Sequence, residues 1–111
     1  MTVTGPAERL TIFIGETDRH GHTPLYTEIV QRAREAGMSG ATVLHGAEGF
    51  GASSRLHAAT PWRLSEDLPA VVVIIDQPER IDAFLPVLDE LIRDGLVIRQ
   101  PVEVITYRSD R

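Results

Sequence analysis

Residues 37–51 read GMSGATVLHGAEGFG, and this stretch decides the fold of the chain. Its first glycine follows a helical pattern and is typical of a helix C-terminus, where the backbone turns left-handed. A short β-prone run follows over about 41–48, and the later glycines begin a long polar segment. The stretch therefore predicts a helix, a strand and a loop in succession. It offers no recognisable nucleophile or acid–base pair, and its glycines indicate backbone that approaches a ligand or a neighbour closely.

The residues before this stretch predict a strand followed by the helix. Residues 8–14 alternate apolar and polar side chains, which is typical of a half-buried strand. Thr23 and Pro24 are expected to be the N-cap and first residue of a helix that Gly37 ends. Residues 1–7 are small and polar, and we expect them to be frayed.

The residues after it predict a second unit of the same kind. Residues 50–66 show no helix or strand pattern, and so long a connection in a compact domain is usually functional or disordered. The run 70–75 is continuously apolar, which is typical of a central strand covered on both faces. We expect Pro78 in the first turn of a second helix, which ends at Asp94-Gly95. Residues 97–107 are expected to form the last strand.

The order of these elements predicts the architecture. Two strand–helix–strand units with right-handed crossovers give an α+β, ferredoxin-like βαββαβ fold with a long loop between strands two and three. Two helices would cover one face of a four-stranded antiparallel sheet. With 111 residues we expect a single domain spanning 1–111. The other face needs a cover, and packing three such sheets into a ring would supply it.

Composition limits the classes of function. The chain has no cysteine, so disulfides and thiolate metal sites are excluded. Its net charge is −5 and all eleven of its cationic side chains are arginines, which argues against a nucleic-acid surface. Two or three arginines with backbone amides could still hold a small phosphate ligand. No basic region followed by an apolar one begins the chain, so we expect a cytoplasmic protein.

Several motifs resemble the PII nitrogen-regulatory proteins. The runs 37–43 and 49–51 resemble the end of their first helix, their second strand and the start of their T-loop. Arg93-Asp94-Gly95 resembles their B-loop, and 104–108 resembles the end of their last strand. Over about residues 8–108, the chain is similar to an uncharacterised PII-like family of the PII and CutA-like superfamily. The stretch GFGASSRLH from Gly49 onward and LSEDLP up to Pro69 carry that similarity.

The resemblance implies a regulatory protein rather than an enzyme, with no required cofactor. It implies a homotrimer that binds a small effector, an adenine nucleotide, in clefts between protomers. The T-loop-like segment 50–66 would relay binding to a target protein, which could be membrane-associated; no nucleic acid is implied. The family's site residues can be carried over by position. One wall of the cleft would then consist of Thr42, Gly49, Phe50 and Gly51. The residues near the phosphates would be Arg93, Asp94, Gly95 and Arg108.

The chain departs from the PII pattern where charge matters. It has one more residue between Thr42 and Gly49, which predicts a bulge or a shifted register. Ala52 and Leu96 stand where the PII pattern has cationic residues. Arg55 is a candidate to replace one of them. These losses weaken the expectation of ATP, and leave AMP, ADP or another small molecule equally open.

Three alternatives remain open. A metal-binding CutA-like trimer would use His20 and His22. A small enzyme acting at the same cleft would need His45, His57 or the Glu66-Asp67 pair as a base or nucleophile. A purely structural trimer would need no ligand at all.

Overall fold

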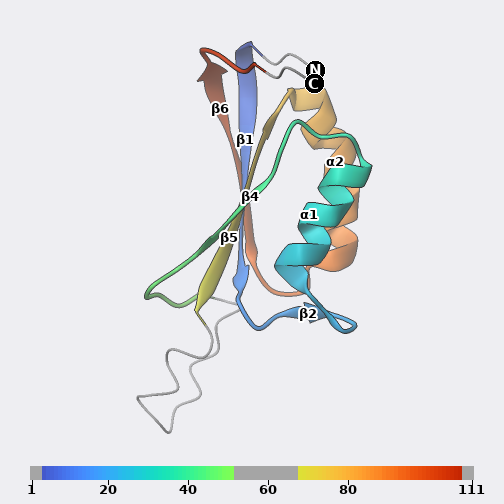
Figure 1. Ribbon diagram of the computed structural model, residues 1–111, viewed down its shortest axis with the longest axis vertical. Helices are drawn as coiled ribbons and strands as arrows, with labels where there is room; N and C mark the ends of the chain where they lie inside the picture. The colour runs from blue at the N-terminus through green and yellow to red at the C-terminus, as the bar shows by residue number, and fades with distance from the viewer. Residues whose placement is uncertain (1–3, 52–67, 109–111) are drawn as a thin grey trace, which may run out of the picture.

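The computed structural model describes residues 4–51 and 68–108. Four strands form an antiparallel sheet in the order β4-β5-β1-β6, and two helices cover one of its faces (Figure 1). The predicted ferredoxin-like α+β fold is confirmed. The elements are β1 (Gly5–Gly15), β2 (Arg19–His20), β3 (Thr23–Pro24), α1 (Leu25–Glu35), β4 (Thr42–His45), β5 (Pro69–Asp76), α2 (Pro78–Leu91) and β6 (Leu96–Val104).

The two ends of this sheet have to be distinguished. β1 and β4 run in one direction, and β5 and β6 run in the other, because every neighbouring pair is antiparallel. We call the end at which β1 begins and β6 finishes, at the top of Figure 1, the terminal end. The opposite end, where Gly15 of β1 pairs with Pro69 of β5, is the loop end.

The core lies between the sheet and the helices. Alternate residues of the two central strands point toward α1 and α2, as the two-residue period of a strand requires. Burying each such aliphatic side chain contributes about 1.5–3 kcal/mol, so this layer is the main source of stability. Its buried members are Leu10, Ile12, Ile14, Leu25, Ile29, Ala33, Ala70, Val72, Ile74, Ile81, Phe84, Leu88 and Leu91.

Both helices are found where the periodicity predicts them, with small differences at their ends. Gly37 follows α1 with a φ of 73°, which confirms the predicted left-handed stop. Pro24, predicted as the first helical residue, is instead the N-cap, because it is extended and pairs with Arg19. α2 begins at Pro78 as predicted but ends before Asp94. Neither helix in the described part of the chain is long and apolar enough to cross a bilayer.

The strands differ from the prediction mainly in length. β1 begins at Gly5, because residues 5–7 pair with 102–104 of β6, so the expected fraying is wrong for these three residues. β4 and β6 are shorter than predicted. β4 pairs with β5 residue for residue, so the bulge expected from the extra residue is absent from this strand.

The face of the sheet turned away from the helices is largely apolar, and no segment among residues 4–51 and 68–108 covers it. We call it the open face. Its large side chains are partly or well exposed, although they come from all four strands. The predicted two-sided cover of the third strand is therefore present on one side only. The open face consists of Phe13, Leu44, Val71, Val73, Ile75, Leu96 and Ile98.

Candidate functional site

The predicted site residues do not gather at one place on the sheet. Arg108 follows β6 at the terminal end, whereas Thr42 begins the short strand β4 at the middle of the sheet, where it pairs with Val73, the partner of Thr11. Residues 49–51 follow β4 and residues 93–95 precede β6, so both belong to the loop end. Arg55 lies outside the described residues. At about 3.3 Å per residue, the four residues of β4 alone separate Thr42 from residues 49–51 by about 10 Å or more.

Glycines at the loop end allow close packing against one proline ring. Gly46 donates its N–H to the carbonyl oxygen of Pro69 over 2.8 Å. A Cβ on Gly46 would lie 2.8 Å from Pro69 Cγ, and one on Gly49 would lie 3.2 Å from the same atom. Gly49 also has a φ of 152°, which disfavours other residues. The expected close approach of the backbone is therefore made to Pro69, at the start of β5.

Gly95 has a similar role on the neighbouring strand. A Cβ at this position would lie 2.8 Å from the carbonyl oxygen of Phe13 and 3.2 Å from Ile14 Cγ2. Because a backbone oxygen cannot move aside cheaply, the turn between α2 and β6 needs glycine here. Arg93 and Asp94, which precede it, are exposed. This turn thus carries a cation and a carboxylate into solvent at the loop end of the sheet.

His45 stands beside this end without joining the candidate group. Its side chain lies on the helix side of β4, with Nδ1 3.4 Å from Glu16 Oε1. Its ring packs edge-on against Tyr26 of α1, with 5.1 Å between ring centroids. The other enzymatic candidates, His57 and Glu66-Asp67, lie outside the described residues. Among residues 4–51 and 68–108, no group of three side chains is placed so that it could hold a metal ion. His20 and His22, the candidate ligands of a CutA-like metal site, therefore belong to no such group.

At the terminal end, a polar cluster joins three segments far apart in sequence. Ser39, between α1 and β4, donates its N–H to Asp76 Oδ2 over 2.9 Å. Its carbonyl oxygen accepts from the hydroxyl of Tyr107 over 2.9 Å. The Asp76 carboxylate is fully buried at the end of β5 and also accepts from the Gln77 N–H at the N-cap of α2. This cluster brings Arg108 to the segment that leads into Thr42.

Sequence reasoning did not find this cluster. Ser39 and Tyr107 entered the sequence analysis only as parts of the family motifs 37–43 and 104–108, and no role in the site was predicted for Asp76. The contacts join residues 37 and 68 positions apart, and no local pattern indicates such pairs. The sequence offers one signal of this cluster, which is the position of Asp76 directly after the apolar run 70–75. A carboxylate buried at the end of such a strand needs hydrogen-bond partners from elsewhere in the chain.

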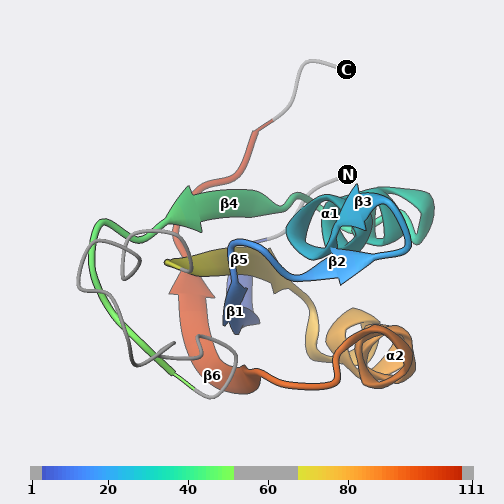
Figure 2. The same cartoon turned by 90° about the horizontal axis from the view of Figure 1, so that it is seen from below.

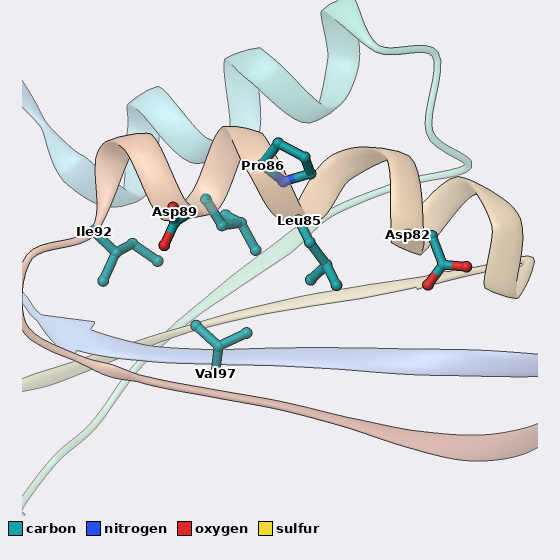
Figure 3. Close-up of a pocket in the computed structure, with 7 residues that line it drawn as sticks. Asp82, Leu85, Pro86, Asp89, Ile92 and Val97 are labelled. Carbon is teal, nitrogen blue, oxygen red and sulfur yellow. The ribbon is translucent and has the colours of Figure 1, made fainter.

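A groove between α2 and β6 lies apart from the predicted site residues. Figure 3 shows Leu85 and Ile92 on the helix above Val97 of the strand, with Asp82 and Asp89 along the helix. Its volume is about 520 Å³, and the lining is predominantly apolar. None of the predicted site residues within the described ranges lines it. The groove is therefore a feature of the helix layer and not part of the predicted cleft.

Comparison with known proteins identifies the family. Residues 7–104 match DUF190, a family described as "Uncharacterized ACR, COG1993". The chain belongs to the DUF190 family. A UPF0166 protein of Aquifex aeolicus is 35% identical over 96 residues, covering 86% of this chain and 90% of the relative. A UPF0166 protein of Methanocaldococcus jannaschii is 34% identical over 93 residues, covering 83% of this chain and 85% of the relative.

Solved structures of PII-like proteins share the fold of this DUF190 chain. A PII-like signalling protein of Thermus thermophilus matches with a TM-score of 0.62 and 20% identity, over 91% of each chain. CPII, a nitrogen regulatory PII-like protein of Thiomonas intermedia, matches with a TM-score of 0.50 and 19% identity. That match covers 89% of this chain and 88% of CPII, whose structure is bound to ADP, AMP and bicarbonate. The resemblance to an uncharacterised PII-like family is thus confirmed.

Proposed function

We propose that this DUF190 protein is a regulatory homotrimer that binds an adenine nucleotide between protomers. Occupancy of that cleft would be relayed to a target protein through the segment 50–66. The physical requirement is that the nucleotide interacts differently with two states of the protein, because a ligand shifts an equilibrium only by its differential affinity.

The separation of the two residue groups carries this proposal. Arg108 lies at the terminal end and Thr42 at the middle of the sheet, on the side of β4 that faces the terminal end, whereas residues 49–51 and 93–95 lie at the loop end. A single protomer therefore offers two half-sites that face different neighbours. If the open faces of three copies pack together, the terminal half-site of one protomer and the loop half-site of the next can meet around one ligand. In the part of the chain that the structure describes, neither half-site alone has enough convergent polar groups to hold a nucleotide.

The charges favour a nucleotide with few phosphates. Among the described residues, one arginine belongs to each half-site, Arg93 at the loop end and Arg108 at the terminal end, and both are exposed. Two guanidinium groups and the backbone N–H groups of a glycine-rich turn suit one or two phosphates. The ADP and AMP held by CPII are of this class. We therefore favour AMP or ADP over ATP.

Regulation fits the site better than turnover does. The described parts of the two half-sites supply arginines, glycines, a threonine, a phenylalanine and an aspartate, but no paired base and nucleophile. His45, the nearest candidate base in the described residues, is turned to the helix side and lies beside Glu16. These groups can bind a ligand, but they do not form a recognisable catalytic arrangement.

Calorimetric titration with AMP, ADP and ATP tests the proposal. Arg93→Gln and Arg108→Gln should each weaken the binding of the tightest nucleotide about tenfold or more, because a charge-assisted hydrogen bond contributes about 1.5–3 kcal/mol. Arg34→Gln is the matched control, since Arg34 is an exposed arginine in the last turn of α1, outside both half-sites. Heat from none of the three nucleotides, or equal affinity in all three variants, would refute the nucleotide site.

A further inference from the structure

The polar cluster at the terminal end is built around one residue, Ser39. Ser39 has its N–H bonded to Asp76, its carbonyl bonded to Tyr107, and its hydroxyl bonded to the carbonyl oxygen of Ile75. Each of these groups comes from a segment other than its own. A residue held through its N–H, its carbonyl and its side chain cannot shift unless one of those bonds opens. We call Ser39, Asp76, Arg80 and Tyr107 the Ser39 hub.

The strand and helix side of the hub is rigid. Asp76 is 0% exposed, and its carboxylate is satisfied by the N–H groups of Ser39 and Gln77 over 2.9 and 2.8 Å. Arg80, one turn into α2, adds an ion pair with 3.4 Å between its Nε and Asp76 Oδ2, and donates to the carbonyl oxygen of Gly37. A buried carboxylate with this set of partners loses several bonds at once if it moves, so it fixes the position of Ser39.

The Tyr107 side of the hub is attached to a chain end. β6 ends at Val104 on one edge of the sheet, and β4 begins beside Ser39 on the opposite edge. Residues 105–108 cross between these edges at the terminal end (Figure 2). The bond from the Tyr107 hydroxyl to Ser39 holds this crossing at its far side. Arg108 is the next residue, and Thr42 follows Ser39 by three positions.

We propose that the Ser39 hub positions the terminal half-site and that effector binding stabilises the bond from Tyr107 to Ser39, which is formed in this structure. This deepens the proposed function, because it assumes that Arg108 and Thr42 contact the effector. Asp76 and Arg80 hold one side fixed, and Tyr107 brings Arg108 to it. A bond between a hydroxyl and a carbonyl is a weak neutral one, so it opens more readily than the carboxylate side does. An effector that contacts Arg108 only when the Tyr107–Ser39 bond is formed shifts residues 105–108 toward that bonded state. Because the coupling is reciprocal, forming the bond raises the affinity for the effector by the same factor.

Tyr107→Phe is the direct test, since it deletes the hydroxyl and keeps the ring. We expect ADP affinity to fall about fivefold, the value of one neutral hydrogen bond. We also expect faster amide hydrogen exchange in peptides that cover 37–42 and 105–108. Tyr26→Phe is the matched control: this second tyrosine lies on α1 against His45, and its variant should change neither quantity.

Two further measurements separate positioning from general stability. In the wild type, saturating ADP should slow exchange over 105–108, and in Tyr107→Phe this slowing should be lost. Asp76→Asn weakens the other side of the hub, so its effect on ADP affinity and that of Tyr107→Phe should not add in the double variant. Unchanged ADP affinity in Tyr107→Phe, or strictly additive effects, would overturn the proposal.

The outcome also distinguishes failure of the hub from failure of the proposed function. If the wild type binds neither AMP, ADP nor ATP, the nucleotide proposal fails, and with it the effector coupling. The hub itself is then judged by exchange in the unliganded protein. Faster amide hydrogen exchange over 37–42 in Tyr107→Phe supports the role of the Ser39 hub in holding residues 105–108 in place. Identical exchange in Tyr107→Phe and the wild type overturns that role.

Discussion

At the scale of single residues, the glycines around the predicted cleft have two separable roles. Gly46 and Gly49 let the chain after β4 pack on the Pro69 ring, and Gly95 lets the turn before β6 approach the Phe13 carbonyl. These contacts lie within the protomer, so much of the glycine pattern is explained by packing without a ligand. The arginines are different, because Arg93 and Arg108 are exposed and their charges have no structural requirement in the fold.

This distinction predicts the effect of Gly95→Ala on stability. The new methyl group would overlap the Phe13 carbonyl oxygen, and relief requires the turn to shift, at a cost of about 1–3 kcal/mol. Urea unfolding measures this loss. Gly40→Ala is the control, because no atom lies within 4 Å of a Cβ there, and it should change the free energy of unfolding by less than about 1 kcal/mol. Equal stability of the two variants would contradict the packing role.

At the scale of elements, the sequence predicted what local periodicity encodes. The apolar stripes and terminal prolines and glycines predict both helices, and the apolar run of β5 predicts the central strand. The β2–β3 ribbon was missed, because strands of two residues have no measurable period. The first residues of β1 were also missed, because Gly5, Pro6 and Ala7 are strand residues only through their pairing with β6, almost a hundred positions later.

The same limit applies to the candidate site. Family resemblance supplied Thr42, Arg93 and Arg108, but no local pattern in the sequence indicates that Arg93 and Arg108 lie at opposite ends of the sheet with Thr42 between them. That follows only from the directions of β4 and β6. The Ser39 hub was missed for the same reason, since it joins an inter-element turn, a strand end and the C-terminal segment. Long-range contacts of polar residues leave no periodic signal in a single sequence.

At the scale of the whole molecule, the open face is the surface that we expect to be covered by another protomer. It is an apolar sheet face that the described part of the protomer leaves uncovered, with Phe13 and Ile75 more than a third exposed. Contiguous apolar surface of this kind marks an interface. Packing three copies through it would cover the second side of β5 and bring the half-sites of neighbouring protomers together.

Two adjacent residues of β6 test this arrangement. Ile98 lies on the open face and Val97 on the helix side, and they are 39% and 38% exposed. Ile98→Glu should convert the trimer to monomers, because it places a charge inside the proposed interface. Val97→Glu should leave the trimer intact. Sedimentation analysis measures both, and a trimer in Ile98→Glu, or monomers in both variants, would contradict the proposed interface.

The most direct measurement of the central claim, that each binding site is shared between two protomers, is complementation of Arg93→Gln by Arg108→Gln. The two variants are unfolded, mixed in equal amounts and refolded together, and ADP binding is compared with that of each variant refolded alone. Random assembly of a shared site should restore about a quarter of the wild-type sites, because half of the protomers supply each intact half-site. No gain on mixing would show that both arginines act within one protomer, and would contradict the account.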